Sequence, residues 1–363
     1  MLAAGCRSSS TDQLAISVTR GACGGSWHAD AGVRTFAVRN GDIVTTEVDL
    51  VDPRTGGVYA EVESLAPNAT RPMRVDLGGG DYAFRCFPED ADMVTGPTVH
   101  LTGAPGAAAV RPISDLDLTD AVASYRRYVT AGLATLSAKV HRLVAMMGSG
   151  NRARIEAAWL DAHLAYARLG AAYGTFGDAA NAIDGTPDGL PGGVRDSGFT
   201  GFHRIEYGLW HGAAVSSLRP LAAQLERDVD GLAADFGREQ VDPRDLPLRA
   251  HEIMENALQF ELTGSADQGS GTSLATALAN VEGTQAVLDA LAPVMAPRYV
   301  QWPAVATWMN TMRRALTSAR TAGHWTPVAE LSTEQREHID AAAGGLLEAL
   351  APIAAIGDVR RTS

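Results

Sequence analysis

Residues 199–210 read Phe199-Thr200-Gly201-Phe202-His203-Arg204-Ile205-Glu206-Tyr207-Gly208-Leu209-Trp210. The stretch places an imidazole and a carboxylate three residues apart inside an apolar, aromatic run. On a helix this spacing puts His203 and Glu206 on one face. Burying such a pair is costly unless the two groups are hydrogen-bonded or bind a metal. The stretch therefore predicts either an ion site or two side chains that satisfy each other.

The bulk composition allows a folded protein of more than one domain. The chain has 363 residues, and 46% hydrophobic with 20% charged residues is ordinary for a globular protein with a real core. Its formal net charge is −12. That charge argues against nucleic acid or an anionic membrane as the main partner and is compatible with cation capture.

The region 13–104 predicts an all-β domain. Short segments with strand-like alternation are separated by turn residues, which is typical of a small β-sandwich. These segments are Leu14–Val18, Thr35–Val38, Val44–Leu50, Met73–Leu77, Tyr82–Cys86 and Thr98–Leu101. Small residues and two prolines then mark 105–114 as a linker.

The region 115–357 predicts packed antiparallel helices with short connections. Asn151 and Ser332 stand at helix-capping positions, and Gln335 gives Ser332 the spacing of a capping box. Pro220 is expected in the first turn of a helix. The expected helices cover about 119–147, the stretch after Asn151, 201–211, the stretch from Pro220, the stretch from Asp242 to Gly264, 273–291, 299–322 and 332–351.

Two motifs resemble those of the imelysin-like family. Gly201-Phe202-His203-Arg204-Ile205-Glu206 is similar to its Gly-x-His-x-x-Glu signature, and Ala279-Asn280-Val281-Glu282-Gly283-Thr284-Gln285 is similar to a second family stretch. The order of the helices between about 116 and 352 also resembles that family. It includes the EfeO-type periplasmic components of bacterial ferrous-iron uptake systems. The resemblance implies a cupredoxin-like β-sandwich followed by an imelysin-like helical bundle.

The resemblance also implies a metal site. His203 and Glu206 supply one nitrogen and one oxygen donor, and Asp184 matches an aspartate of the family that joins the metal cluster. This donor set suits ferrous iron, zinc or manganese better than calcium or magnesium. The family often has two glutamates one turn apart on the preceding helix, and those positions fall at Ala167 and Gly170 here. The acidic cluster is therefore thinner in this chain.

Further acidic residues are second-tier candidates for the site. They are Glu255 and Glu282, in apolar helices, and Asp178. Asp161 and His163 are possible substitutes, although the stripe from Trp159 to Tyr173 is mainly a core face and favours a core role for His163. Without a metal, the alternative for His203 and Glu206 is a mutual hydrogen bond.

The three cysteines divide into one candidate lipid site and one even pair. Leu2-Ala3-Ala4-Gly5-Cys6 resembles a bacterial lipobox, in which Cys6 would carry the lipid. The usual basic and apolar signal regions do not precede it, so we expect a misassigned start or a truncated signal, with 1–12 as a lipoprotein tether. An exported protein would oxidise the remaining pair, Cys23 and Cys86. Cupredoxins bind copper through a cysteine, two histidines and often a methionine, but no histidine follows Cys86 closely, so no copper is expected.

The resemblance implies an extracytoplasmic, lipid-anchored protein of the cell envelope that captures ferrous or ferric iron. It would pass the ion to a membrane permease and work beside a haem-type peroxidase of the same uptake system. Zinc is a second possible ion. The protein is expected not to be an enzyme, with no nucleic-acid partner and no membrane contact beyond the lipid. The alternatives are an imelysin-like metallopeptidase, for which one helical histidine is weak support, and a non-catalytic envelope lipoprotein that binds an organic ligand.

Overall fold

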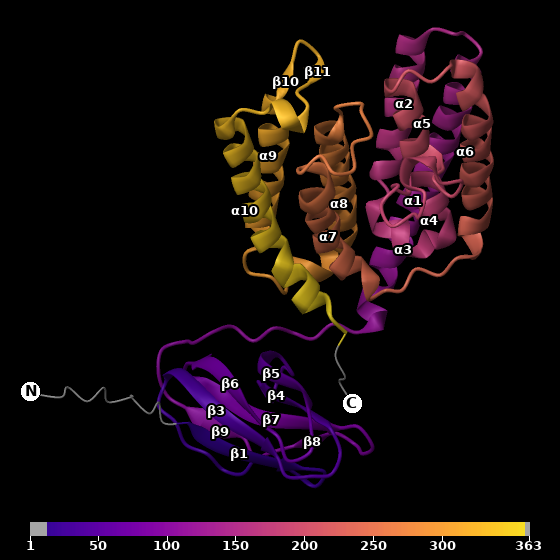
Figure 1. The fold of residues 1–363 in the computed structure, drawn as a ribbon. Coiled ribbons are helices and arrows are strands. Elements are labelled where there is room, and N and C mark those ends of the chain that lie inside the picture. The colour runs from indigo at the N-terminus through magenta and orange to yellow at the C-terminus, as the bar shows by residue number, and fades with distance from the viewer. Residues whose placement is uncertain (1–12, 360–363) are drawn as a thin grey trace, which may run out of the picture. The chain divides into compact units, whose positions relative to one another are not determined.

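The computed structural model describes residues 13–359, which divide into a β unit that runs through Ser114 and a helical unit that spans Asp115–Asp358 (Figure 1). Val359 pairs with Ile113 and belongs to the β unit. The predicted layout, strands first and helices after, is confirmed. The predicted lipidation site Cys6 and the tether 1–12 lie outside the described residues.

The β unit consists of two sheets. One has the order β2-β1-β3-β6 and the other β5-β4-β7-β8, with β9 also paired to β7. β1 and β3 run parallel, and the other pairs are antiparallel. The strands are β1 Leu14–Thr19, β2 Ala22–Cys23, β3 Gly32–Asn40, β4 Thr46–Val51, β5 Val58–Leu65, β6 Thr70–Leu77, β7 Gly80–Pro88, β8 Val94–Thr95 and β9 Val99–Leu101. Alternate residues of both sheets, such as Phe36, Leu50 and Phe84, form one buried core.

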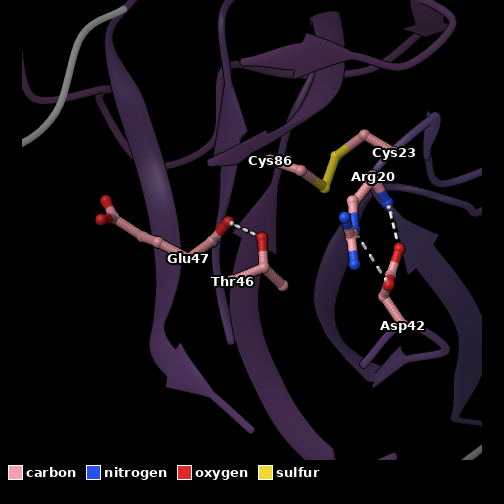
Figure 2. The surroundings of a disulfide bond; sticks show 6 residues. All are labelled: Arg20, Cys23, Asp42, Thr46, Glu47 and Cys86. Carbon is pink, nitrogen blue, oxygen red and sulfur yellow. Dashed lines mark hydrogen bonds and ion pairs between the residues drawn. A yellow bond between two sulfur atoms is a disulfide. The ribbon is translucent and has the colours of Figure 1, made fainter. Parts of the chain in front are cut away.

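A disulfide joins Cys23 on β2 to Cys86 on β7 and so links the two sheets (Figure 2). The two Cα atoms are 5.6 Å apart, an ordinary separation for a disulfide. Both cysteines are almost fully buried in the core. Beside the bond, the Asp42 carboxylate accepts hydrogen bonds from the backbone N–H and the Nε–H of Arg20.

Strand β5 was not among the predicted strands. Its pairing with β4 contains register shifts between Thr46 and Val48 and between Leu50 and Val51. Such bulges put two residues of one strand against one residue of the other and interrupt the alternation of buried and exposed side chains. A prediction that relies on strict alternation of polar and apolar residues therefore misses this strand.

The predicted linker 105–114 runs along the β unit. Val110 exchanges two backbone hydrogen bonds of 2.8 Å with Val58, and the Ala107 N–H donates to the Asp76 carbonyl. Ile113 is fully buried. Proline and small residues thus give this segment an extended path that pairs with the β unit at Ala107 and Val110.

The helical unit contains two groups of helices, seen side by side in Figure 1. One group consists of α1, α2, α5 and α6 with the short α3 and α4, and the other of α7 to α10. Helix α8 packs against α1 and α2 and connects the groups. The bounds are α1 Asp115–Met147, α2 Arg152–Ala167, α3 Tyr173–Phe176, α4 Asp178–Asp184, α5 Gly201–Trp210, α6 Val215–Asp235, α7 Asp245–Asn256, α8 Ser273–Met295, α9 Trp302–Ser318 and α10 Thr333–Gly357.

The helix starts agree with the sequence at two caps and differ at one proline. Asn151 caps α2 through the Arg154 N–H, and Ser332 and Gln335 form the capping box of α10. The expectation for Pro220 is wrong, because α6 begins at Val215 and Pro220 lies inside the helix. Leu218 explains the extra turn, since it is buried and packs closely against Gly208 of α5.

Among the described helices, α10 meets the length and hydropathy expected of a membrane span. One face of α10, including Ile339, Leu346 and Ile353, is buried, and the helix packs on α7 and α9. A core helix of a folded domain satisfies the same criteria, so composition alone does not assign α10 to a membrane.

Candidate metal centre

The start of α5 is fixed against the end of α4 by a glycine. Gly201 has a φ of +71°, and a Cβ there would overlap the backbone carbonyl of Ile183. Only glycine combines this backbone conformation with such a close approach. The Thr200 hydroxyl adds a 2.9 Å hydrogen bond to the Ala182 carbonyl. These contacts bring the first turn of α5 beside Asp184, the last residue of α4.

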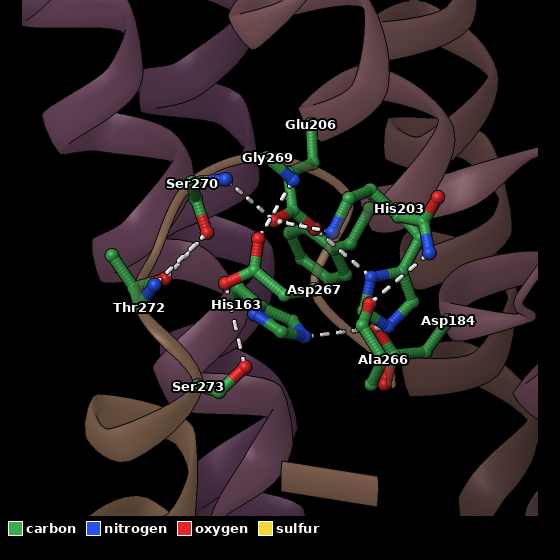
Figure 3. A network of polar contacts seen from close by, with 12 residues as sticks. His163, Asp184, His203, Glu206, Ala266, Asp267, Gly269, Ser270, Thr272 and Ser273 are labelled. Carbon is green, nitrogen blue, oxygen red and sulfur yellow. Dashed lines mark hydrogen bonds and ion pairs between the residues drawn. The ribbon is translucent and has the colours of Figure 1, made fainter. Parts of the chain in front are cut away.

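Three side chains from three helices converge at this point (Figure 3). Nε2 of His163, on α2, lies 3.0 Å from Oδ1 of Asp184, and Nε2 of His203, on α5, lies 3.7 Å from the same oxygen. One ligand atom from each of the three residues can be chosen so that all lie within 4.8 Å of one another. His163 and His203 are 3% and 5% exposed. The arrangement is compact enough to hold one metal ion.

Glu206 holds His203 in position rather than facing the other two residues. Its Oε2 lies 3.0 Å from Nδ1 of His203. Its Oε1 accepts hydrogen bonds from the backbone N–H groups of Gln268, at 3.0 Å, and Ser270, at 3.2 Å. A hydrogen bond at Nδ1 fixes the ring and leaves Nε2 directed toward Asp184. Figure 3 shows this chain of contacts from the loop 262–272 through Glu206 to His203.

In the centre, the attraction between the histidines and the carboxylates outweighs the effect of burial on their pKa values. Burial alone would lower the pKa of His163 and His203, but the carboxylates of Asp184 and Glu206 together outweigh it and raise the pKa of both. Burial would likewise raise the pKa of Asp184 and Glu206, yet the histidines next to them lower it. Two histidines and two carboxylates therefore balance one another without an ion, and a cation must displace protons to bind.

One nitrogen of the centre has no hydrogen-bond partner. Within residues 13–359, Nδ1 of the buried His163 is unpaired. The ring is stacked on Trp159, with centroids 5.0 Å apart, and the indole N–H of Trp159 donates to the Phe202 carbonyl. An orphaned buried polar atom is unusual and calls for a functional or structural reason. His163 is thus buried in the core, and its other ring nitrogen, Nε2, faces Asp184.

Two cavities adjoin the cluster. A small one of about 10 Å³, the space of a single water or ion, is lined by His163, His203 and Glu206. A larger one of about 410 Å³ has Asp184 and His203 in its wall. Ala167 and Gly170, the positions where the family glutamates were expected, also line it. An ion bound at the cluster would therefore lie between the small polar cavity and the larger one.

Of the ligands predicted from sequence, the structure brings His203 and Asp184 together, whereas Glu206 lies on the far side of the His203 ring and contacts its Nδ1. The second-tier residues lie elsewhere. Glu282 forms a 2.6 Å ion pair with Arg168, and Glu255 is exposed and 3.6 Å from His251. Asp178 is exposed at the start of α4 and lines a separate cavity. Asp161, named as a substitute, pairs with Lys139.

Sequence reasoning missed two acidic residues near the centre. Asp267 accepts hydrogen bonds from the backbone N–H groups of Gly269 and Gly271 and thereby shapes the loop 262–272. Glu261 follows α7 and lines both cavities. No regular helical spacing marks Glu261, because it ends the π-helical segment Ala257–Glu261, whose period differs from 3.6 residues.

Two imidazoles and one carboxylate form a donor set with known chemical preferences. The same set, with open coordination positions, holds ferrous iron in non-haem iron proteins, and imidazole also suits zinc. His163, His203 and Asp184 therefore fit iron or zinc better than calcium or magnesium. They also leave coordination positions free for further ligands.

Comparisons with known proteins agree with this description. A family model named for peptidase family M75 and described as imelysin matches residues 121–353. The chain is 27% identical over 266 residues to the "Iron uptake system component EfeO" of Escherichia coli K12, covering 73% of this chain and 69% of that protein. The proteins of the same name from Shigella flexneri and Shigella boydii match to the same extent.

Proposed function

The chain belongs to the imelysin family, and on that premise we propose that it is the iron-binding component of a bacterial iron-uptake system. His163, His203 and Asp184 coordinate the ion, and Glu206 orients His203. The ion is cargo, so the site must bind it selectively and also release it.

One observation carries the proposal. His163, Asp184 and His203 come from three separate helices, and their ligand atoms lie within 4.8 Å of one another. A purely structural polar cluster would satisfy its buried atoms, yet Nδ1 of His163 is unpaired in the described chain. The relatives that share this region carry iron uptake in their name.

The proposal extends to location and partners. The protein works outside the plasma membrane, anchored by lipid on Cys6, and delivers iron to a membrane permease of the same system, with a haem-type peroxidase as a further partner. A disulfide inside the β unit supports an oxidising compartment. Mass spectrometry of the mature N-terminus tests the lipid, and an unmodified residue 6 on the cellular protein would contradict it.

Direct metal titration tests the proposed site. The metal-stripped protein is expected to bind one ferrous ion, under anaerobic conditions, or one zinc ion, with a heat signal that is lost in His163→Ala. Zinc is used beside ferrous iron because Zn²⁺ cannot be oxidised during the titration. Absence of binding by the unmodified protein for both metals would overturn the proposal.

Glu206→Gln is expected to weaken metal binding by about 10–100-fold, which is usual for residues that orient a metal ligand. A carboxylate accepts hydrogen bonds at both oxygens, whereas an amide accepts at only one end. The variant therefore cannot accept both from Nδ1 of His203 and from the Gln268 and Ser270 N–H groups. Competition titration with a zinc indicator measures the change.

The matched control for this variant is Glu282→Gln. Glu282 pairs with Arg168 outside the cluster, so the same chemical change there should leave zinc affinity unaltered. Equal affinities of Glu206→Gln and the unmodified protein would show that Glu206 does not prepare His203 for a metal.

A peptidase, suggested by the family name, has less support from the site. Zinc peptidases commonly use two helical histidines one turn apart, and here Tyr207 stands one turn after His203. His211 stacks on the Tyr207 ring, is exposed, and contacts the Tyr207 carbonyl. Turnover of a peptide library that is abolished in His203→Ala would favour the peptidase over iron capture.

The larger cavity supports a second candidate function, the binding of an organic ligand. Its volume of about 410 Å³ lies in the range of small-molecule sites, and Tyr166, Tyr173 and Asn181 contribute aromatic and amide groups to its wall. Native mass spectrometry after gentle purification distinguishes the candidates. A retained organic mass without metal would favour this second function.

A further inference from the structure

A third cavity of the helical unit, of about 680 Å³, lies beside the loop 262–272. None of the three proposed metal ligands lines it. Its volume lies in the range of small-molecule sites. Besides the loop, the wall consists of the C-terminal end of α5, the segment 327–329 and the first turn of α10, which contribute Tyr207, Trp210, His211, Pro327, Val328 and Arg336.

Arg336 brings a positive charge to this cavity without an acidic partner among residues 13–359. Its Nη2 donates a 2.7 Å hydrogen bond to the Val328 carbonyl, which leaves most of the five guanidinium N–H groups for a ligand. The one acid in the described wall is Asp267, and its carboxylate already accepts from two N–H groups of its own loop and from the Ser273 hydroxyl. The cavity therefore offers an anion one available guanidinium.

The end of α5 gives the cavity an aromatic side. The rings of Tyr207 and His211 are stacked, with centroids 4.1 Å apart. Nδ1 of His211 donates to the Tyr207 carbonyl at 2.9 Å, which fixes the orientation of the imidazole. Pro327 and Val328 add apolar surface to the wall. Flat aromatic and apolar surface beside a guanidinium suits an aromatic ring that carries a carboxylate.

The loop that contains Gly269 borders both this cavity and the metal centre. Gly269 has a φ of +123°, and a Cβ there would lie 2.9 Å from the Cβ of Trp210, so the loop packs directly on the end of α5. The residues on either side, Gln268 and Ser270, donate their backbone N–H groups to Glu206 (Figure 3). A ligand that contacts this loop in the cavity therefore also restricts the two amides that position Glu206.

We propose that this cavity binds a small aromatic carboxylate through Arg336 and that its occupancy strengthens metal binding at the centre. The carboxylate accepts hydrogen bonds from the guanidinium, and the ring lies on the aromatic side. By packing on the loop, the ligand holds the loop amides on Glu206 and so keeps His203 in its metal-binding orientation. Such coupling is reciprocal, so the metal also tightens the binding of the carboxylate. The coupling rests on the proposed function, whereas the anion site does not.

Benzoate is the probe for the anion site, and benzamide, which has nearly the same shape without the charge, is its comparison. Calorimetric titration of the metal-free, full-length protein should give saturable benzoate binding with a Kd of about 10 mM or tighter, a modest efficiency for a ligand of this size. Benzamide should bind at least about tenfold more weakly, because it cannot form charge-assisted hydrogen bonds. This comparison needs no variant, so it tests the site even if a substitution disturbs the start of α10.

Arg336→Gln should weaken benzoate binding at least about tenfold for the same reason. Arg336→Lys keeps the charge and should retain more of the affinity than Arg336→Gln. The matched control is Arg314→Gln, at an exposed position of α9 where the guanidinium contacts Thr311. It should bind benzoate as the unmodified protein does.

Zinc titration with and without saturating benzoate measures the coupling. Benzoate binds free Zn²⁺ weakly, and a titration of zinc into benzoate buffer alone corrects for it. The zinc affinity of the unmodified protein should rise at least about fivefold with benzoate, the lower end of the usual coupling between two sites. In Arg336→Gln, the same benzoate concentration should leave the zinc affinity nearly unchanged.

The outcomes separate the claims. Absence of saturable benzoate binding, or equal binding of benzoate and benzamide, would overturn the anion site, while zinc binding without benzoate would still support metal capture. Benzoate binding without a rise in zinc affinity would overturn the coupling alone. A protein that binds benzoate but neither zinc nor ferrous iron would overturn the proposed function and the coupling, and would leave the anion site supported.

Discussion

His203→Ala is expected to lower the affinity of the protein for ferrous iron and zinc by more than about 100-fold, because the change removes a ligand as well as the ring that Glu206 positions. His163 and Asp184 would remain, but two donors compete poorly with water for a borderline cation. The fold should persist, since α5 is held by Gly201 and Thr200 rather than by the imidazole. Isothermal titration with zinc, and with ferrous iron under argon, measures the loss.

A thermal melt beside the titration distinguishes a metal ligand from a purely structural residue. If His203 and Glu206 only satisfied each other, the variant would keep its metal affinity and lose about 1–3 kcal/mol of folding free energy, from the carboxylate left with fewer partners. That result would remove the main support for iron capture. His141→Ala is the control, because His141 is an exposed histidine of α1 that pairs with Asp230 at 2.8 Å.

Removal of the disulfide by the double substitution Cys23→Ala and Cys86→Ala is expected to destabilise the β unit by about 4 kcal/mol. The two residues are 63 positions apart in the sequence. In the chain-entropy model, closing a loop of that length restricts the unfolded chain by this amount. The link also joins the two sheets, so its loss frees β2 from β7 within the core. Calorimetry of the oxidised protein and the variant measures the shift.

The helical unit provides an internal control for this experiment. Its unfolding transition and its zinc affinity should be the same in both proteins, because the substitutions lie in the β unit alone. A β-unit transition that stays within about 1 kcal/mol of the original would contradict the prediction and would mean that core packing, not the cross-link, sets its stability.

The sequence predicts the contact of the centre that lies within a single helix. His203 and Glu206 share a face of α5 because three residues are nearly one turn, and this needs no tertiary information. Asp184 is indicated by the resemblance to the imelysin-like family and not by local spacing. The second half of the Glu206 interaction, with the N–H groups of Gln268 and Ser270, could not be predicted, because it joins residues 62 and 64 positions apart.

The missed features have physical reasons as well. His163 lies in a stripe with Trp159 and Tyr166, and periodicity identifies such a stripe as core without revealing that one ring nitrogen stays unpaired. Glu261 ends a π-helical segment, and the wider π turn shifts the register that a period of 3.6 assumes. In the β unit, the bulges between β4 and β5 broke the alternation in the same way.

The backbone amides of Gln268 and Ser270 are built-in spectroscopic reporters of the centre. Both donate to the same oxygen of a buried, negatively charged Glu206, although they belong to a loop and not to the helices that carry the ligands. Their proton resonances should therefore lie downfield and exchange slowly with deuterated solvent. Ion binding changes the charge around Glu206. In a metal titration, the resonances of these two amides should therefore shift earlier than those of the other loop amides.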